Sequence, residues 1–208
     1  MSNYQLFHND LPDEIVGEFQ TSISIDTETM GLNIKRDRLC LIQMKNNDNG
    51  NYYLIQIPKG NNKNKFKNLK KILENKSILK IFHYARFDIA VINHYLGIKT
   101  KNIFCTKIAS KLVRTYTDKH GLKDLISELI NISIDKKEQS SNWSNEKLSE
   151  NQIQYALNDV KYLFDLKKIL SSELEKKSLI KTYSKIISFL DTKVELDLLG
   201  WDYDLFAH

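Results

Sequence analysis

The first third of the chain alternates polar and apolar positions in short runs, as half-buried β-strands do. Residues 21–26 predict one strand, and residues 38–44 and 52–57 predict two more that are buried more deeply. The segment 46–51 is rich in asparagine and glycine, which tolerate positive φ, so it predicts a hairpin turn. Consecutive hairpin strands indicate that the sheet begins in an antiparallel arrangement.

The pattern then changes to alternating strands and helices. Residues 78–82 form a short β-rich run suited to an inner strand, and residues 102–105 could form another. Between them, residues 85–95 follow a helical period, and Gly97 is suited to end that helix. A preceding helix is predicted by an apolar stripe at helical spacing, formed by Phe66, Leu69, Ile72 and Leu73.

Everything beyond about residue 106 has a helical pattern, including a helix over 121–130. The clearest helix opens at Ser149, where Ser-Glu-Asn-Gln matches a capping box in which Gln152 reaches back. Its apolar stripe is predicted to run through Ile153, Ala156, Val160, Leu163 and Ile169. Hairpin strands, then alternating strands and helices, then helices together predict an α/β domain with a mixed sheet flanked by helices.

Composition agrees with a globular protein of this kind. The chain has 208 residues, 41% of them apolar, which is enough for one domain with a substantial core. No run approaches the roughly 18 apolar residues that a membrane span needs, and no signal peptide is recognisable. We therefore expect a cytoplasmic protein without a membrane partner. Cys40 and Cys105 lie in apolar surroundings and are expected to be buried free thiols.

The net charge of +5 permits a polyanionic partner, but it is weak evidence for one. All but four of the 31 basic residues are lysine, which a biased base composition could also produce. The stretch 59–80 holds eight lysines and a single acid. This stretch could be a solvated loop and helix face, or a surface that attracts phosphates.

Two acids stand at the end of the first predicted strand. Asp26 ends that strand and Glu28 follows two residues later, so in an extended chain both point to the same face. Two carboxylates pointing together repel one another unless a cation lies between them. The alternative is that both lie just past the strand in solvent, with Asp26 capping a turn.

Two further acids belong to predicted helices. Asp88 adjoins the apolar surface of the helix 85–95 and follows a strand, where α/β proteins collect ligands. It could also be an ordinary first-turn acid favoured by the helix dipole. Tyr155 and Asp159 are four residues apart on the capped helix, which directs a hydroxyl and a carboxylate to one point. The alternative is a tyrosine at the core edge and an exposed acid.

These five residues fit a single mechanism. Carboxylates on separate elements can hold two divalent ions about 3.5–4 Å apart, and oxygen ligands suit Mg²⁺ or Mn²⁺. One ion would present a water to a phosphorus atom while the other stabilises a leaving 3′-oxygen. The predicted catalytic residues are Asp26, Glu28, Asp88, Tyr155 and Asp159, of which the four acids are the metal ligands and Tyr155 orients the water.

The order of these residues is familiar. The motifs D-x-E, H-x-x-x-x-D and Y-x-x-x-D resemble the three exonuclease motifs of the DEDDy 3′→5′ exonuclease family, which contains RNase D. The likeness covers nearly the whole chain, including DTETMGL, RDRLCLIQ, KIFHYARFD and LSENQIQYALNDV. Within the family the chain resembles the short bacterial branch known as nano-RNase C, a diribonuclease.

The resemblance implies an RNase H-like fold with a mixed five-stranded sheet and a single exonuclease domain over 1–208, without the HRDC domains of RNase D. It implies that Asp26, Glu28 and Asp159 bind the first ion directly. Asp26 would also hold the second, with Asp88 in its outer sphere. It further implies a homo-octamer. An apolar tail agrees with this, although it could instead dock on its own domain: Leu198, Leu199, Trp201, Tyr203, Leu205 and Phe206.

The implied substrate is short RNA, most specifically a 5′-phosphorylated diribonucleotide. Leu32 would wedge between the two bases and His83 would lie near the substrate. Arg114, Tyr116 and His120 would cap the 5′-phosphate, either in the site of their own chain or in that of a neighbour. Leu32 could also be an ordinary loop residue, and the other three a structured turn. Two other functions stay open: a general RNase D-like exonuclease on RNA 3′ ends or DNA, and an inactive nucleic-acid-binding module.

Overall fold

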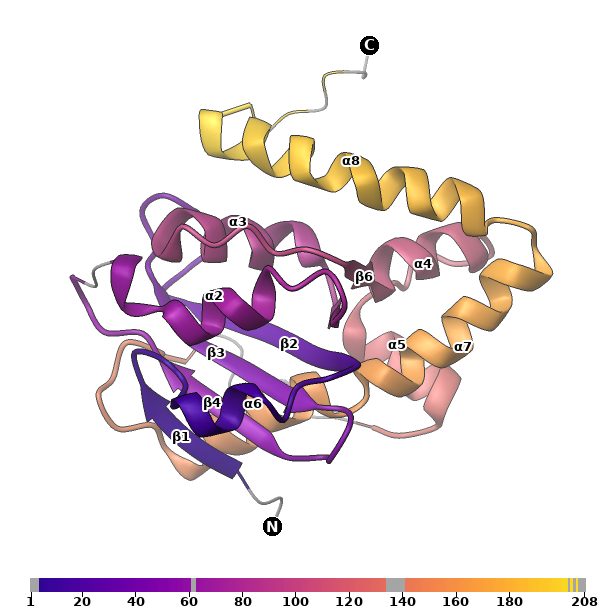
Figure 1. Cartoon of the computed structure of the whole chain (residues 1–208). Coiled ribbons are helices and arrows are strands. Elements are labelled where there is room, and N and C mark those ends of the chain that lie inside the picture. Colours follow the sequence, from indigo (N-terminus) through magenta and orange to yellow (C-terminus); the bar gives the residue numbers. More distant parts are fainter. Residues whose placement is uncertain (1–3, 61–62, 134–140, 202, 204, 206–208) are drawn as a thin grey trace.

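The centre of the protein is a six-stranded mixed sheet in the order β1-β4-β3-β2-β5-β6 (Figure 1). The computed structural model describes residues 4–60, 63–133, 141–201, 203 and 205. The strands are β1 (Tyr4–His8), β2 (Ser22–Thr29), β3 (Leu39–Asn46), β4 (Tyr52–Gln56), β5 (Leu79–Phe82) and β6 (Ile103–Cys105).

The antiparallel start predicted from the sequence is confirmed. Strand β3 pairs antiparallel with both β2 and β4, and β5 and β6 then extend the sheet in parallel from β2. The mixed α/β class is therefore confirmed, but the sheet has six strands instead of five. The additional strand is β1, which pairs in parallel with β4 at the edge of the sheet. Its five residues are mostly exposed, and the sequence analysis predicted no strand there.

Helices cover both faces of the sheet (Figure 1). The helical elements are α1 (Asp13–Val16), the 3₁₀ turn η1 (Lys63–Lys65), α2 (Lys67–Leu73), α3 (Ala85–Leu96), α4 (Thr106–Val113), α5 (Leu122–Ile130), α6 (Glu150–Lys161), α7 (Leu163–Lys176) and α8 (Ile180–Leu199). Helices α2 and α3 pack on one face and α6 on the other, while α4, α5 and α7 pack beside β5 and β6. No helix in the described part of the chain could cross a membrane.

Alternation along β2 assigns its side chains to the two faces. Ile23 and Ile25 join the core beneath α3. Asp26 and Glu28 are out of phase with them, and Glu28 is paired across the antiparallel ladder with Leu41, which packs against α6. Both acids therefore face α6, because residues paired across a ladder share one side of the sheet.

Two predicted helix ends are confirmed. Helix α3 ends at Gly97, which has a φ of 68° in the left-handed region that glycine adopts readily. Ser149 caps α6 in a complete capping box: its side chain accepts from the backbone N–H of Gln152, and the Gln152 side chain accepts from the backbone N–H of Ser149.

The continuous apolar stripe predicted beyond Ser149 is wrong in its second half. The helix is interrupted at Tyr162, so α6 and α7 present different faces to the core. Helix α7 consequently buries Leu163, Leu166, Leu170 and Leu174, whereas Ile169 is only partly buried.

The two cysteines are buried and free, as predicted. The lysine-rich stretch 59–80 is not uniformly solvated. Lys67 and Lys70 are exposed, but Lys80 is fully buried and its Nζ donates to the carbonyl oxygens of Asn75 and Ile78. Lys80 therefore caps backbone carbonyls in the interior and contributes nothing to a phosphate-attracting surface.

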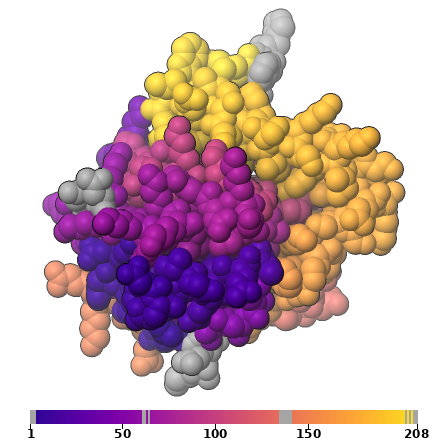
Figure 2. Space-filling model, in the orientation of Figure 1, coloured from indigo at the N-terminus to yellow at the C-terminus, as the bar shows by residue number. Residues whose placement is uncertain are grey.

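Helix α8 lies across α3 and is held there by a buried carboxylate. The C-terminal helices sit against the layer that contains α3 (Figures 1 and 2). Asp197 accepts hydrogen bonds from Nε and Nη2 of Arg86, both at 2.6 Å, and from Nζ of Lys193 at 2.7 Å. Burial alone would raise the pKa of Asp197, but these cations outweigh it and lower that pKa. This clamp joins the C-terminal helix to the first turn of α3.

The variant Asp197→Ala should lower the free energy of unfolding by about 3 kcal/mol, because it removes the carboxylate from a largely buried ion pair. Urea unfolding at neutral pH measures this. The exposed pair between Asp191 and Lys101 on the same helix supplies the control, and Asp191→Ala should cost less than about 1 kcal/mol. Equal losses in the two variants would contradict the clamp.

The same clamp should respond to pH. The folded-state pKa of Asp197 is lowered, so its stabilisation is complete above the unfolded value of about 3.9 and disappears as the pH falls through the folded value. The difference between the wild type and Asp197→Ala should therefore shrink in acid.

Candidate active site

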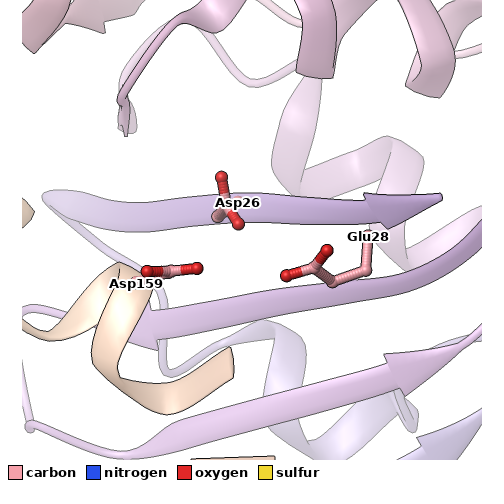
Figure 3. A group of neighbouring side chains, drawn as sticks. All are labelled: Asp26, Glu28 and Asp159. Atoms are coloured by element: carbon pink, nitrogen blue, oxygen red, sulfur yellow. The ribbon is translucent and has the colours of Figure 1, made fainter. Parts of the chain in front are cut away.

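Three carboxylates from two elements converge beside the centre of the sheet. Asp26 and Glu28 project from β2, and Asp159 projects from α6, which packs on the same face. One oxygen from each lies within 4.8 Å of the others, and Figure 3 shows the three side chains directed toward one space. Strand β2 extends to Thr29, so both of its acids lie within the strand and not beyond it.

These acids are held in an environment that opposes their ionisation. Burial raises the pKa of Asp26 well above its ordinary value, and the charges of Asp88, Asp159 and Glu28 raise it further. Burial and the charge of Asp159 likewise raise the pKa of Glu28. A bound divalent cation would reverse this balance, because it attracts the ionised form of every acid in the group.

Gln43 is a contact of these acids that the sequence analysis missed. It lies opposite Asp26 in the β2–β3 register and its Nε2 donates to Oδ2 of Asp26 at 2.6 Å. The same Nε2 lies 3.4 Å from Oε1 of Glu28. A glutamine within the apolar run of residues 39–44 was a usable signal, but its contact with Asp26 could be inferred only from the strand register. Gln43 orients Asp26 by occupying one of its oxygens.

Asp88 belongs to the same cleft but not to the group of three. It lies in the first turn of α3, and its Oδ1 accepts from the hydroxyl of Thr27 at 2.7 Å. Thr27 stands between Asp26 and Glu28 on β2 and therefore points to the opposite side of the strand. Burial raises the pKa of Asp88 to about 8.

Tyr155 lies one turn before Asp159 on α6. Burial raises its pKa, and the charge of Asp159 and a hydrogen bond to it act in the same direction. The ring packs against the buried Trp143, with centroids 5.9 Å apart and planes inclined at 47°. Tyr155 is therefore a neutral hydroxyl held in a defined position beside the carboxylates.

A cleft of about 600 Å³ opens onto these groups. All five predicted catalytic residues line it, together with the predicted substrate residues Leu32 and His83. Nδ1 of His83 lies 2.9 Å from the hydroxyl of Thr106, which itself donates to the carbonyl of Phe82. The hydroxyl has one proton, so it must accept from His83, and Nδ1 therefore carries hydrogen.

Leu32 lies in the loop between β2 and β3 and lines the cleft. Its side chain is 86% exposed. Beneath the loop, the buried Asp37 accepts from the backbone N–H of Asn33 at 2.9 Å and from Arg36, and these hydrogen bonds lower its pKa to about 2. A Cβ at Gly31 would lie 2.4 Å from Oδ2 of Asp37, so only glycine fits there.

The residues predicted to cap a 5′-phosphate do not line this cleft. Arg114 is buried and forms an ion pair with Glu128, and Nδ1 of His120 lies 2.8 Å from the hydroxyl of Ser110. Tyr116 is 71% exposed, and its hydroxyl donates to Glu128 at 2.5 Å. In this arrangement they do not reach the cleft of their own chain, and a role at a neighbouring chain stays a prediction.

The group formed by Asp26, Glu28 and Asp159 fits a hard cation. Its ligand atoms are all carboxylate oxygens, which suit Mg²⁺ or Mn²⁺, whereas zinc sites usually include nitrogen or sulfur. Among the described residues, no histidine or cysteine belongs to the group.

Comparison with known protein sequences agrees with this geometry. The family described as 3′-5′ exonuclease matches residues 7–175. Ribonuclease D of Bartonella henselae is 30% identical over 183 residues, which are 88% of this chain and 42% of that protein. The chain thus spans less than half the length of this curated relative.

Solved structures give the same result. Brucella melitensis NrnC bound to pGG is 47% identical, with a TM-score of 0.92 over 100% of both chains, and another structure of NrnC contains bound Mg²⁺. Escherichia coli RNase D shares the fold, with 23% identity and a TM-score of 0.77 over 92% of this chain and 50% of that one. With its carboxylate cleft inside the matched region, the chain belongs to the RNase D-like 3′-5′ exonuclease family.

Proposed function

We propose that this protein is a metal-dependent 3′→5′ exoribonuclease that hydrolyses very short RNA. The observation that carries the proposal is the convergence of Asp26, Glu28 and Asp159 within 4.8 Å in the cleft of a chain from the exonuclease family. A phosphodiester is itself negatively charged, so it can approach these acids only if cations lie between them.

The proposed cofactors are two divalent ions, Mg²⁺ or Mn²⁺. Asp26, Glu28 and Asp159 would hold the first, Asp26 would also contact the second, and Asp88 would act in its outer sphere. When bound, such ions activate a water and stabilise the charge on a leaving oxygen. The Mg²⁺-bound structure of NrnC, 47% identical to this chain, supports the assignment.

Two protein groups complete the proposed chemistry. The raised pKa of Tyr155 keeps its proton on the phenolic oxygen, so it acts as a hydrogen-bonding group that orients the attacking water. Gln43 occupies Oδ2 of Asp26 and thereby leaves Oδ1 available for metal binding. Neither residue needs to form a covalent bond with the substrate.

The proposed substrate is a 5′-phosphorylated diribonucleotide, which would be converted to mononucleotides. The main support is the likeness to NrnC, whose structure was solved with pGG, over the whole of both chains. Leu32 and His83 line the cleft, which agrees with a wedge between bases and a substrate contact. A general exonuclease on longer RNA or DNA is the alternative, and the likeness to Ribonuclease D supports it.

We also propose a homo-octamer, in which a cleft could receive the Arg114–His120 loop of a neighbouring chain. The side chain of Tyr116 in that loop is 71% exposed, so another chain could contact it. Several apolar side chains at the C-terminal end are also exposed: Leu199, Trp201, Tyr203 and Leu205. Leu198 is partly buried against the main core, and Phe206 lies outside the described residues.

The octamer predicts a defined mass. Light scattering at micromolar concentration should give about eight times the 24.3 kDa of one chain, because closed symmetric rings bury such apolar surface. A 24.3 kDa species under these conditions would refute the proposed assembly.

Metal binding should depend on pH in a definite direction. The pKa values of Asp26, Glu28 and Asp88 are higher in the folded protein than in the unfolded chain, so protons bound to these acids stabilise the fold. This stabilisation is complete below the unfolded-state pKa values and is lost as the pH rises through the folded-state pKa values, about 8 for Asp88. A metal must displace these protons. Mn²⁺ should therefore raise the melting temperature more at about pH 8.5 than at about pH 6.

The variant Asp26→Asn tests whether Asp26 is a metal ligand. It should remove most of the Mn²⁺-induced rise in melting temperature and at least about 100-fold of the turnover number, since it loses a ligand charge and keeps the shape. Without metal its stability should not fall. Turnover close to that of the wild type would exclude Asp26 as a ligand.

The variant Tyr155→Phe should separate metal binding from chemistry. It should retain the Mn²⁺-induced rise in melting temperature, yet lose about 10²–10⁴-fold of the turnover number, the usual contribution of a positioned hydrogen-bonding group. Turnover is measured at saturating diribonucleotide with Mn²⁺. An unchanged value would show that the hydroxyl has no role in the reaction.

Substrate length decides between the proposed functions. A time course on 5′-labelled RNA of two to about ten nucleotides should show a strong preference for the dinucleotide, because buried donors built around a terminal phosphate discriminate by up to about 10⁴-fold. Equal rates on five nucleotides would favour the general exonuclease. If none of these RNAs were hydrolysed in the presence of Mn²⁺, the result would favour an inactive nucleic-acid-binding module.

A further inference from the structure

Tyr84 has a backbone conformation that tyrosine rarely adopts. Its φ is 70° and its ψ is 43°, which places it in the left-handed region. For a bulky side chain this is a genuine outlier, and such strain concentrates at functional sites. The residue joins β5 to α3 between His83 and Ala85, at the rim of the cleft.

Local structure does not explain why this residue is a tyrosine. Tyr84 is the N-cap of α3, and its carbonyl accepts from the backbone N–H of Phe87, which any residue could provide. Its side chain makes no capping hydrogen bond. Asparagine or glycine would suit the left-handed backbone better, and both are favourable N-caps. The tyrosine ring must therefore serve a purpose other than starting the helix.

The ring is placed where a substrate would pass. Tyr84 is 44% exposed and lines the carboxylate cleft. It also lines a second cavity of about 330 Å³, and only Leu32 and Phe87 share both linings with it among the described residues. These three side chains thus lie between a cavity lined by the carboxylates and a cavity lined by Lys35 and by the Arg86–Asp197 pair.

A cation is associated with the ring. Nζ of Lys107 lies 4.2 Å from the ring centroid, within the range of a cation–π interaction. Lys107 also lines the cleft. One face of the ring is thereby fixed by a positive charge, while a large part of the side chain remains accessible.

We propose that Tyr84 is a nucleobase-stacking residue of the substrate site, held at the cleft by a strained backbone. The inference rests on the proposed nuclease function and extends it to a residue that determines substrate affinity. Flat aromatic rings bind bases of any identity by stacking. Leu32 and Tyr84, which line the same cleft, would then both contact the bases.

The test compares Tyr84→Gly and Tyr84→Asn with the wild type in steady-state hydrolysis of a 5′-phosphorylated diribonucleotide. Both variants suit the left-handed backbone, so their melting temperatures should equal or exceed that of the wild type. Loss of one stacked base should raise KM about 10- to 100-fold, with kcat within about threefold of the wild type. Tyr84→Phe keeps the flat ring and should restore the KM.

Ser178→Gly is the matched control, since Ser178 also has a left-handed φ, of 57°, but lies between α7 and α8 away from the cleft. It should raise stability without altering KM. An unchanged KM in Tyr84→Gly and Tyr84→Asn would overturn the proposal. A rise in the KM of Tyr84→Phe as large as that of the other two variants would also overturn it. A fall in melting temperature together with kcat would indicate a structural role instead. Failure of the nuclease function itself would appear in the wild type, which would then hydrolyse no dinucleotide.

Discussion

The mutual repulsion of three closely spaced carboxylates, one buried and two half-buried, is the constraint around which this protein is arranged. Asp26, Glu28 and Asp159 can stay within 4.8 Å of one another only because rigid elements hold them there. Strand β2 lies between β3 and β5 in the sheet, and α6 is anchored at its start by the capping box of Ser149. The packing energy of these elements offsets an arrangement that is unfavourable until a cation enters.

Because of this arrangement, side chains from both sides of β2 contribute to the cleft. Asp26 and Glu28 face α6, whereas Thr27 between them points to the opposite side and holds Asp88 at the start of α3. The position of α3 therefore decides where Asp88 lies in the cleft. It is secured from above by α8, through the pair between Arg86 and Asp197, so residues far from the carboxylates help to determine their geometry.

The rim of the cleft shows where stability has been given up for function. Leu32 is almost fully exposed on a loop that Asp37 holds in place, and Tyr84 adopts a backbone conformation that glycine would tolerate better. An isolated domain gains nothing from either feature. Both are understandable if the cleft must present apolar surfaces to a ligand that is flat on one side and charged on the other.

Periodicity, turn residues and capping are local properties, so the sequence by itself determined the order of strands β2 to β6, the Ser149 cap and five of the residues that line the cleft. Other features depend on contacts between distant segments, and only the tertiary structure decided them. The edge strand β1 forms only because β4 is available to pair with it, and Gln43 meets Asp26 only through the strand register. The family resemblance implied that Arg114 binds a phosphate, but folding buries its guanidinium and places the exposed Glu128 beside it. A sequence shows which groups are present, whereas packing across the fold decides which groups become partners. The reason is that a charge can be buried only where the fold also supplies a partner that offsets the cost of removing it from water.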